Sequence, residues 1–152
     1  HWPATKPLFF RISAQDEGGW SLEDSVVLAR ELKARGVDAI DCSSGGINVR
    51  SPTAGARKPV LGFQVPFAER IRREAGIATV AVGLIVDAAQ ANEIVARGQA
   101  DLVALGRELL WNPFWTAQAA RTLGADPDYR GMPPQYGWWL ERRLQTGYEK
   151  EL

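Results

Sequence analysis

The sequence predicts an α/β protein: four βα units that form the second half of a (βα)8 TIM barrel, followed by a C-terminal tail. Short apolar runs alternate with amphipathic stretches from Leu8 to Leu105. Strands as apolar as these are typical of parallel sheets covered by helices. Ala34–Asp38 and Ala96–Asp101 both run from a helix end through a glycine into a strand, as expected of a fold built from similar units. A full barrel needs roughly 250 residues, so four units are half of one.

The first two strands and the helix between them are marked by local signals. The apolar run Leu8–Ser13 predicts the first strand, and Val37–Ser43 predicts the second. Ser21 is a typical N-cap residue and Gly36 a typical residue just past a helix end, so they bound the first helix. The apolar residues of this helix that share one face are Leu22, Val26, Ala29 and Leu32.

The second half of the pattern repeats the first. After a loop containing Gly and Pro that reaches to about Phe63, a second helix ends at Gly76. Ala78–Val82 predicts the third strand and Leu102–Leu105 the fourth, with a helix capped by Asp87 between them. The residues expected to face inward from these two helices are Phe67, Ala68, Ile71, Ala91, Ile94 and Val95.

Composition and charge exclude several classes of function. The 18 Lys and Arg balance the 18 Asp and Glu, so there is no broad positive field for nucleic acid or an anionic membrane. The single cysteine, Cys42, cannot form an intrachain disulfide and is interpreted as an inert buried thiol. Arg70, Arg72 and Arg73 indicate a solvated helix face. We expect a soluble, cytoplasmic protein without a metal site.

Two glycines stand where the third and fourth strands end. Gly83 lies in Ala81–Leu84, and Gly106 precedes Arg107 in Leu105–Glu108. As barrel strands seven and eight, these strands would end where such barrels bind phosphate, with backbone N–H groups and a helix N-terminus facing the anion. Arg107 would add a charged fork. The alternative is that both glycines are turn residues and that Arg107 pairs with a nearby carboxylate.

The order and spacing of several motifs resemble those of the old yellow enzyme family of FMN-dependent ene-reductases. The resemblance covers nearly the whole chain. The tail motif Pro134–Trp139 is similar to the ending of the bacterial subgroup of NADPH dehydrogenases and xenobiotic reductases. The motifs that carry the resemblance are Pro7–Ser13, Ile40–Gly46, Ala81–Gly83, Asp101–Leu110 and Asn112–Pro113.

The resemblance implies a cofactor, a hydride donor and a substrate class. In this family FMN at the C-terminal mouth of the barrel takes hydride from NADPH and passes it to an activated alkene such as an enone. Arg11 matches the arginine at the pyrimidine edge of the flavin, where a positive charge stabilises the reduced ring; an ion pair with Asp41 is the alternative. The residues implied to line the cofactor site are Ser43, Ser44 and Gly45, with Gly83, Gly106 and Arg107 at the FMN phosphate. The alternative for the first three is that they form a plain turn.

The catalytic groups of the family have no counterpart in these residues. Family members bind the substrate carbonyl through a His-His or His-Asn pair and protonate through a Tyr, all in the first half of the barrel. The one histidine here is His1, and Tyr129, Tyr136 and Tyr148 follow the strands. We therefore assign no catalytic residue to this chain and expect it to be inactive alone.

Residues 1–123 are interpreted as the half-barrel with the FMN phosphate site and residues 124–152 as the tail. A start at His1–Pro3 without Met and two open sheet edges predict a partner: the N-terminal half-barrel, as a separate or permuted chain. In the related subgroup the tail enters the adjacent subunit, so Trp138 and Trp139 are the expected substrate-pocket residues of a homo-oligomer. The alternatives are an isolated or engineered half-barrel without turnover, and another phosphate-binding barrel enzyme.

Overall fold

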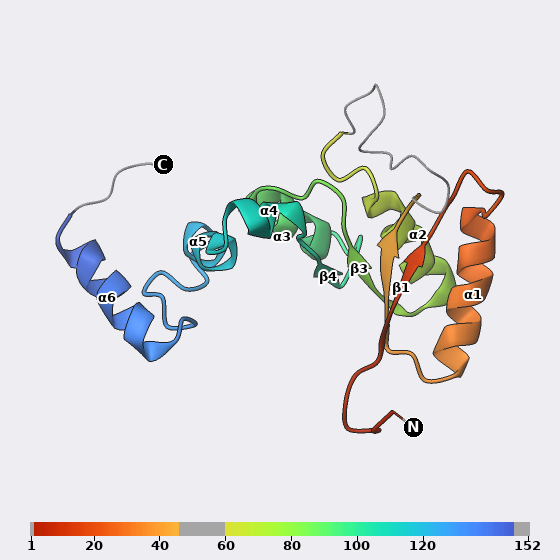
Figure 1. Ribbon diagram of the computed structural model, residues 1–152, viewed down its shortest axis with the longest axis horizontal. Helices are drawn as coiled ribbons and strands as arrows, with labels where there is room; N and C mark the ends of the chain where they lie inside the picture. The colour runs from red at the N-terminus through yellow and green to blue at the C-terminus, as the bar shows by residue number, and fades with distance from the viewer. Residues whose placement is uncertain (1, 46–59, 148–152) are drawn as a thin grey trace. The chain divides into compact units, whose positions relative to one another are not determined.

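A computed structural model describes residues 2–45 and 60–147 of the chain (Figure 1). They group into two compact units. The first unit runs to Val86 and resumes over Gln90–Leu105, and the second comprises Asp87–Ala89 and the residues from Gly106 onward. The predicted boundary between residues 123 and 124 separates a half-barrel from a tail by function, whereas these two units are defined by compactness. The predicted boundary therefore stays a prediction.

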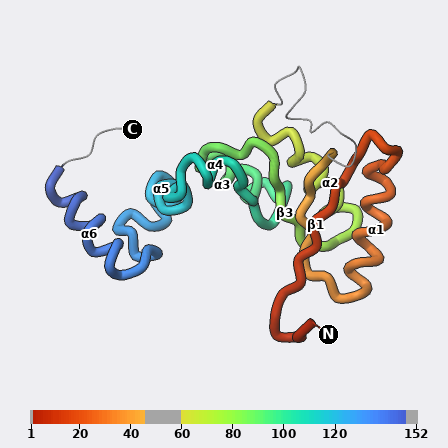
Figure 2. The backbone as a smooth tube through the Cα atoms, in the orientation of Figure 1, coloured from red at the N-terminus to blue at the C-terminus, as the bar shows by residue number. Residues whose placement is uncertain are grey.

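A parallel sheet forms the centre of the first unit. Its strands are β1 (Phe9–Ser13), β2 (Ala39–Ser43), β3 (Ala78–Ala81) and β4 (Leu102–Val103), in the order β1-β2-β3-β4. Each neighbouring pair is parallel, and Figure 2 shows the chain passing from β1 through a helix and back to β2. The predicted α/β fold with a parallel sheet is confirmed, although β4 is only two residues long.

The helices of the first unit begin and end at the predicted signals. Helix α1 (Leu22–Ala34) starts with a capping box, in which Ser21 and Asp24 each accept a hydrogen bond from the other's backbone N–H. Helix α2 (Val65–Ala75) ends at Gly76, whose φ of 62° is left-handed. Helix α3 (Ala88–Ala96) follows β3.

The core lies between the sheet and these helices. Helix α2 contacts α1, β2 and β3. Ile40 and Cys42 of β2 are completely inaccessible to solvent. Ala91 and Ile94 of α3 are buried as predicted, but Val95 is 43% exposed. One residue past Ile94 is about 100° further around a helix, so Val95 faces away from the core.

The repeated helix end, glycine and strand carry the same hydrogen bonds in both copies. Asp38 Oδ2 accepts from the Leu8 N–H at 2.7 Å, and Asp101 Oδ2 accepts from the Thr79 N–H at 2.9 Å. The backbone N–H groups of the two aspartates donate back to the carbonyls of the same partners, Leu8 and Thr79. Each aspartate therefore ties the strand that follows it to the start of the preceding strand.

The prediction that three arginines of α2 form a solvated face holds only for Arg73, which is 68% exposed. Arg72 binds Asp101 through two hydrogen bonds of 3.0 and 3.1 Å. Arg70 pairs with Glu23 of α1 at 2.7 Å and with Glu74 at 2.9 Å. These long side chains reach carboxylates on neighbouring elements, which a helical periodicity does not reveal.

Replacing Asp101 by Asn is expected to lower the free energy of unfolding by about 1 kcal/mol near neutral pH. The fork from Arg72 holds the pKa of Asp101 below its ordinary value, with help from the Thr79 N–H. A lowered pKa stabilises the fold above the ordinary Asp value, and this stabilisation is lost as pH falls through the lower folded-state value. Urea unfolding at about pH 7 and about pH 3 measures the difference between variant and parent, which should shrink at the lower pH.

Asp38→Asn is the matched control. Asp38 accepts the equivalent backbone N–H but has no arginine partner among the described residues. An equally large pH-dependent loss in both variants would contradict the role given to the Arg72 fork.

The second unit is helical, with α4 (Arg107–Trp111), α5 (Trp115–Thr122) and α6 (Pro134–Gln145). The turn before α6 is held by Asp126, whose carboxylate accepts the N–H groups of Arg130 and Gly131 at 2.8 Å each. Gly137 of α6 is buried next to this turn. A Cβ at position 137 would lie 2.9 Å from the Tyr129 carbonyl oxygen, so a larger residue would require the backbone to shift.

Candidate functional site

The carboxyl ends of the four strands meet at one edge of the first unit, because all the strands are parallel. Parallel α/β folds bind their ligands outside this edge, on the segments that follow the strands. Here those segments begin at Ala14, Ser44, Val82 and Ala104. The last of them continues through Leu105 into the second unit at Gly106.

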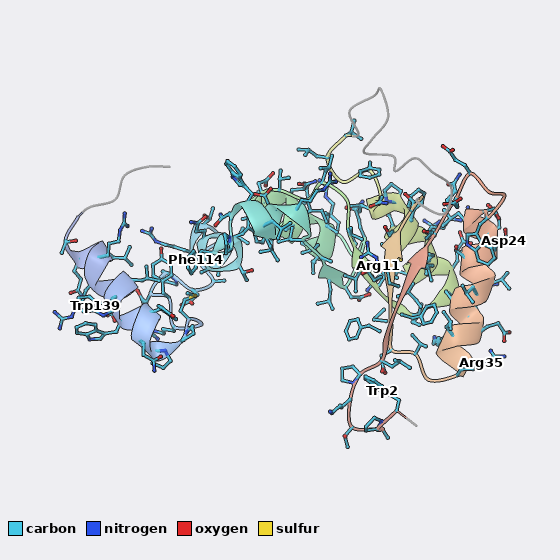
Figure 3. The ribbon with its side chains drawn as sticks, viewed as in Figure 1. Trp2, Arg11, Asp24, Arg35, Phe114 and Trp139 are labelled. Atoms are coloured by element: carbon cyan, nitrogen blue, oxygen red, sulfur yellow. The ribbon has the colours of Figure 1, made fainter. Side chains whose placement is uncertain are left out.

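Arg11 and Asp41 are register partners on β1 and β2, and they form an ion pair of 2.6 Å. The ion pair with Asp41 is therefore present, and it does not decide between a structural role and flavin contact for Arg11. The Arg11 side chain, labelled in Figure 3, is nevertheless 57% exposed. Only Nη1 is engaged among the described residues, so the other donors of the guanidinium can bind a ligand. Flavin contact through Arg11 stays a prediction.

The residues after β2 are tied to the end of β1. Gly45 has a φ of 69°, its N–H donates to the Gln15 carbonyl at 3.0 Å, and its own carbonyl accepts the Ser13 hydroxyl at 3.1 Å. Ser44 is half-buried between Gly45 and Ser43, the last residue of β2. These contacts place Ser44 and Gly45 at the carboxyl edge of the sheet, and their contact with a cofactor stays a prediction.

The segment after β3 has an unusual backbone. Gly83 has a φ of 110° and Leu84 a φ of 50°, and a left-handed conformation costs a non-glycine residue roughly 1 to 2 kcal/mol. The Gln90 side chain makes two hydrogen bonds to this segment: it donates to the Leu84 carbonyl at 3.3 Å and accepts from the Val86 N–H at 3.1 Å. Among the described residues, no acceptor meets the N–H groups of Gly83 and Leu84. Strained backbone with free donors is typical of binding sites.

Gln64, which the sequence analysis did not single out, lies against this segment. It is 5% exposed, and its Nε2 donates to the Ser44 hydroxyl oxygen at 2.7 Å. A Cβ on Gly83 would lie 2.7 Å from its Oε1. A glycine at position 83 is therefore favoured for two reasons: its positive φ, and the steric clash that a side chain would make with Gln64. No sequence signal distinguishes this buried amide from an exposed polar residue that begins a helix.

Gly106 and Arg107 open the second unit. A Cβ on Gly106 would meet nothing within 4 Å. The N–H groups of Gly106, Arg107 and Glu108 have no acceptor in the described part of the chain. The exposed Arg107 side chain has no partner there either, so the alternative of a nearby carboxylate is not observed. Helix α4 has only five residues, and its dipole is correspondingly weak.

Cys42 confirms its interpretation as an inert thiol. It is completely buried in β2, and burial, with a smaller contribution from Asp41, raises its pKa to about 12. The thiol therefore stays protonated and unreactive at physiological pH. Among residues 2–45 and 60–147 no group of three metal-ligating side chains occurs.

Trp138 and Trp139 lie on α6 of the second unit and expose 47% and 66% of their surface. Their rings meet edge to face with centroids 4.5 Å apart, and the Arg142 guanidinium lies 4.4 Å above the Trp138 ring. Figure 3 labels Trp139 on this helix. Within the second unit, these rings form a large exposed aromatic surface.

The parallel sheet, with polar and glycine residues after the carboxyl ends of its strands, is typical of one class of protein. Members of this class are α/β proteins that bind a ligand at the carboxyl ends of parallel strands. The model of the NADH:flavin oxidoreductase / NADH oxidase family matches residues 4–126. The chain therefore belongs to this family.

Curated relatives agree with this assignment. The chain is 50% identical to the NADPH dehydrogenase of Geobacillus thermodenitrificans over 137 residues, which is 87% of this chain and 38% of that protein. It is 52% identical to the NADPH dehydrogenase of Halalkalibacterium halodurans over 121 residues, 78% of this chain and 34% of that protein. The chain thus spans less than two fifths of the length of these relatives.

These similarities confirm the resemblance to the old yellow enzyme family and the prediction of FMN and NADPH at the level of that family. An oxidoreductase class is likewise supported. The described helices include none that is both long and apolar enough to cross a membrane. The cytoplasmic location and the partners stay predictions.

Proposed function

We propose that the chain is the C-terminal part of an FMN-dependent NADPH ene-reductase that reduces activated C=C bonds, as in enones. The observation that carries this proposal is that N–H groups after β3, and others after β4, have no acceptor among the described residues, in a chain that belongs to a flavin oxidoreductase family. FMN supplies the hydride-transfer chemistry when it is bound. The protein residues supply binding, orientation and charge.

The free donors suit the phosphate of FMN. A phosphate dianion is bound best by several N–H groups and a guanidinium fork. The N–H groups at Gly83 and Gly106 and the Arg107 side chain have no acceptor in the described part of the chain and are donors of this kind. No described atom lies within 4 Å of a Cβ at Gly106. We assign the phosphate to Gly83, Gly106 and Arg107.

The isoalloxazine is assigned to the β1 and β2 ends. The free donors of Arg11 would bind the pyrimidine edge, where Asp41 keeps the guanidinium in place through the ion pair. A fixed positive charge there favours the reduced ring. Ser44 and Gly45 would line the cofactor next to it.

A complete barrel requires a second half. Among the described strands, β1 and β4 are each paired on one side only, and open edges are a liability that barrels remove by closure. The relatives are more than twice as long as this chain. We therefore assign closure of the barrel, binding of the alkene carbonyl and proton donation to an N-terminal half-barrel.

The test is to purify the complete protein and to measure flavin and turnover. A yellow protein that releases FMN on denaturation and oxidises NADPH faster with an enone supports the proposal. A colourless protein that binds a different phosphorylated ligand would favour another phosphate-binding barrel enzyme. A folded assembly that holds FMN without turnover would favour a half-barrel module.

We further propose that α6 contributes Trp138 or Trp139 to the substrate pocket of an adjacent subunit in a homo-oligomer. Large exposed rings of this kind are typical of interface anchors. Trp139→Ala and Trp138→Ala are expected to weaken subunit association, the stronger of the two by roughly thirtyfold, and to lower kcat/KM for bulky enones. Analytical ultracentrifugation and enone kinetics measure the two effects.

Trp2→Ala is the control, because Trp2 is also exposed, at 59%, but lies at the other end of the chain. If both α6 variants keep the parent's oligomeric state and its kcat/KM for small and bulky enones, the shared site must be abandoned.

A further inference from the structure

Gln64, which is 5% exposed, is a buried polar side chain at the carboxyl edge of the sheet to which the proposed function gives no role. It is the residue before α2, yet its side chain makes no hydrogen bond to the α2 backbone. The side chain instead contacts the segments after two strands. One contact is with Ser44 after β2, and the other is with Gly83 after β3.

The contacts determine the orientation of the amide. A backbone carbonyl only accepts hydrogen bonds, so the group that faces the Ser44 carbonyl at 3.4 Å must be Nε2. The same nitrogen donates to the Ser44 Oγ at 2.7 Å. The Ser44 hydroxyl is thereby an acceptor from Gln64, and its own proton has no acceptor among the described residues.

The other end of the amide lies against Gly83. Its Oε1 would be 2.7 Å from a Cβ at Gly83, and its Cβ and Cγ would each be 3.1 Å away. The Gly83–Leu84 backbone, with two successive positive φ values, therefore lies directly on the Gln64 side chain. One buried side chain links the Ser44 hydroxyl to the strained segment with the free N–H groups.

We propose that Gln64 is a positioning residue for the flavin: it turns the Ser44 hydroxyl so that it donates to the cofactor. The inference rests on the proposed function, because it takes the ligand at this edge to be FMN. Gln64 acts through Ser44 and does not need to touch the cofactor.

Gln64→Glu tests this in the complete protein. The carboxylate keeps the shape of the side chain but has no N–H, so the Ser44 hydroxyl would donate to Glu instead of to the cofactor. Loss of one hydrogen bond is expected to raise the Kd for FMN roughly three- to tenfold. Gln15→Glu is the matched control: it adds the same charge at an exposed position of the same edge and should change the Kd less than about twofold.

A double-mutant cycle separates positioning from general stability. If Gln64 acts through Ser44, then the uncharged Gln64→Met in a Ser44→Ala background should add almost nothing to the Kd for FMN. A purely structural role would give additive effects. Gln64→Met, which has similar length and no donor, replaces the Glu variant if that one does not fold.

The outcomes are distinct. An unchanged Kd in Gln64→Glu, additive effects in the cycle, or failure of both variants to fold would overturn the inference while the proposed function stands. A parent protein that binds no FMN would overturn the proposed function and this inference with it.

Discussion

Arg107→Ala is expected to weaken FMN binding by the complete protein roughly ten- to a hundredfold. The loss of a charged hydrogen bond to a phosphate costs about 1.5 to 3 kcal/mol, which corresponds to this change in Kd. We expect a large effect on FMN affinity because, among the described residues, no carboxylate binds the Arg107 guanidinium in competition with the phosphate. Titration of FMN into the apoprotein, followed by flavin fluorescence, measures the Kd.

Two further variants sharpen this experiment. Arg107→Lys keeps the charge but loses the planar fork, so it should give an intermediate Kd. Arg73→Ala is the control, because Arg73 is also an exposed arginine, on α2, and pairs with Glu74. An FMN affinity of Arg107→Ala equal to that of the parent would remove Arg107 from the phosphate site.

The chain alone is expected to show no NADPH-dependent reduction of an enone above background. The described residues contain no histidine, and Tyr129 and Tyr136 lie in the second unit, beyond the last strand. Absence of a proton donor alone lowers a rate by about a hundred- to ten-thousandfold, and absence of a carbonyl-binding pair lowers it further. NADPH consumption at 340 nm, at about micromolar protein, measures the turnover.

The positive control is the same assay with the N-terminal half of the protein added. Activity should rise with the concentration of the added half and reach a plateau at one equivalent. Sustained turnover by the lone chain, purified to a single mass, would show that its own residues carry the chemistry and that the assignment to the other half is wrong.

Local sequence signals predicted most of the elements. Ser21 with Asp24 begins α1, and the glycines at 36 and 76 end α1 and α2 in left-handed conformations. These signals are reliable because they depend on the φ preferences of single residues and on hydrogen bonds over three or four residues. The order of the strands followed from the alternation of strand and helix, since short right-handed crossovers place successive strands side by side.

The candidate site was predictable only where a motif marks it. Gly83, Gly106 and Arg107 were proposed from their place at the strand ends, and Arg11 from its motif. Gln64 was not found, because a glutamine before a helix has the same local pattern whether it is buried or exposed. Its burial depends on Ser44, twenty residues earlier in the chain, and on Gly83.

The amino-acid sequence by itself determined the α/β class, the parallel arrangement, the helix ends and the positions of the phosphate-binding candidates. Only the tertiary structure decided which side chains meet: Arg72 with Asp101, Arg11 with Asp41, and Gln64 with Ser44. The physical reason is that backbone preferences act over a few residues, whereas a side-chain partner is selected by strand register and helix packing between distant segments. Arg107 has no partner among the described residues, and that is the property on which its proposed role depends.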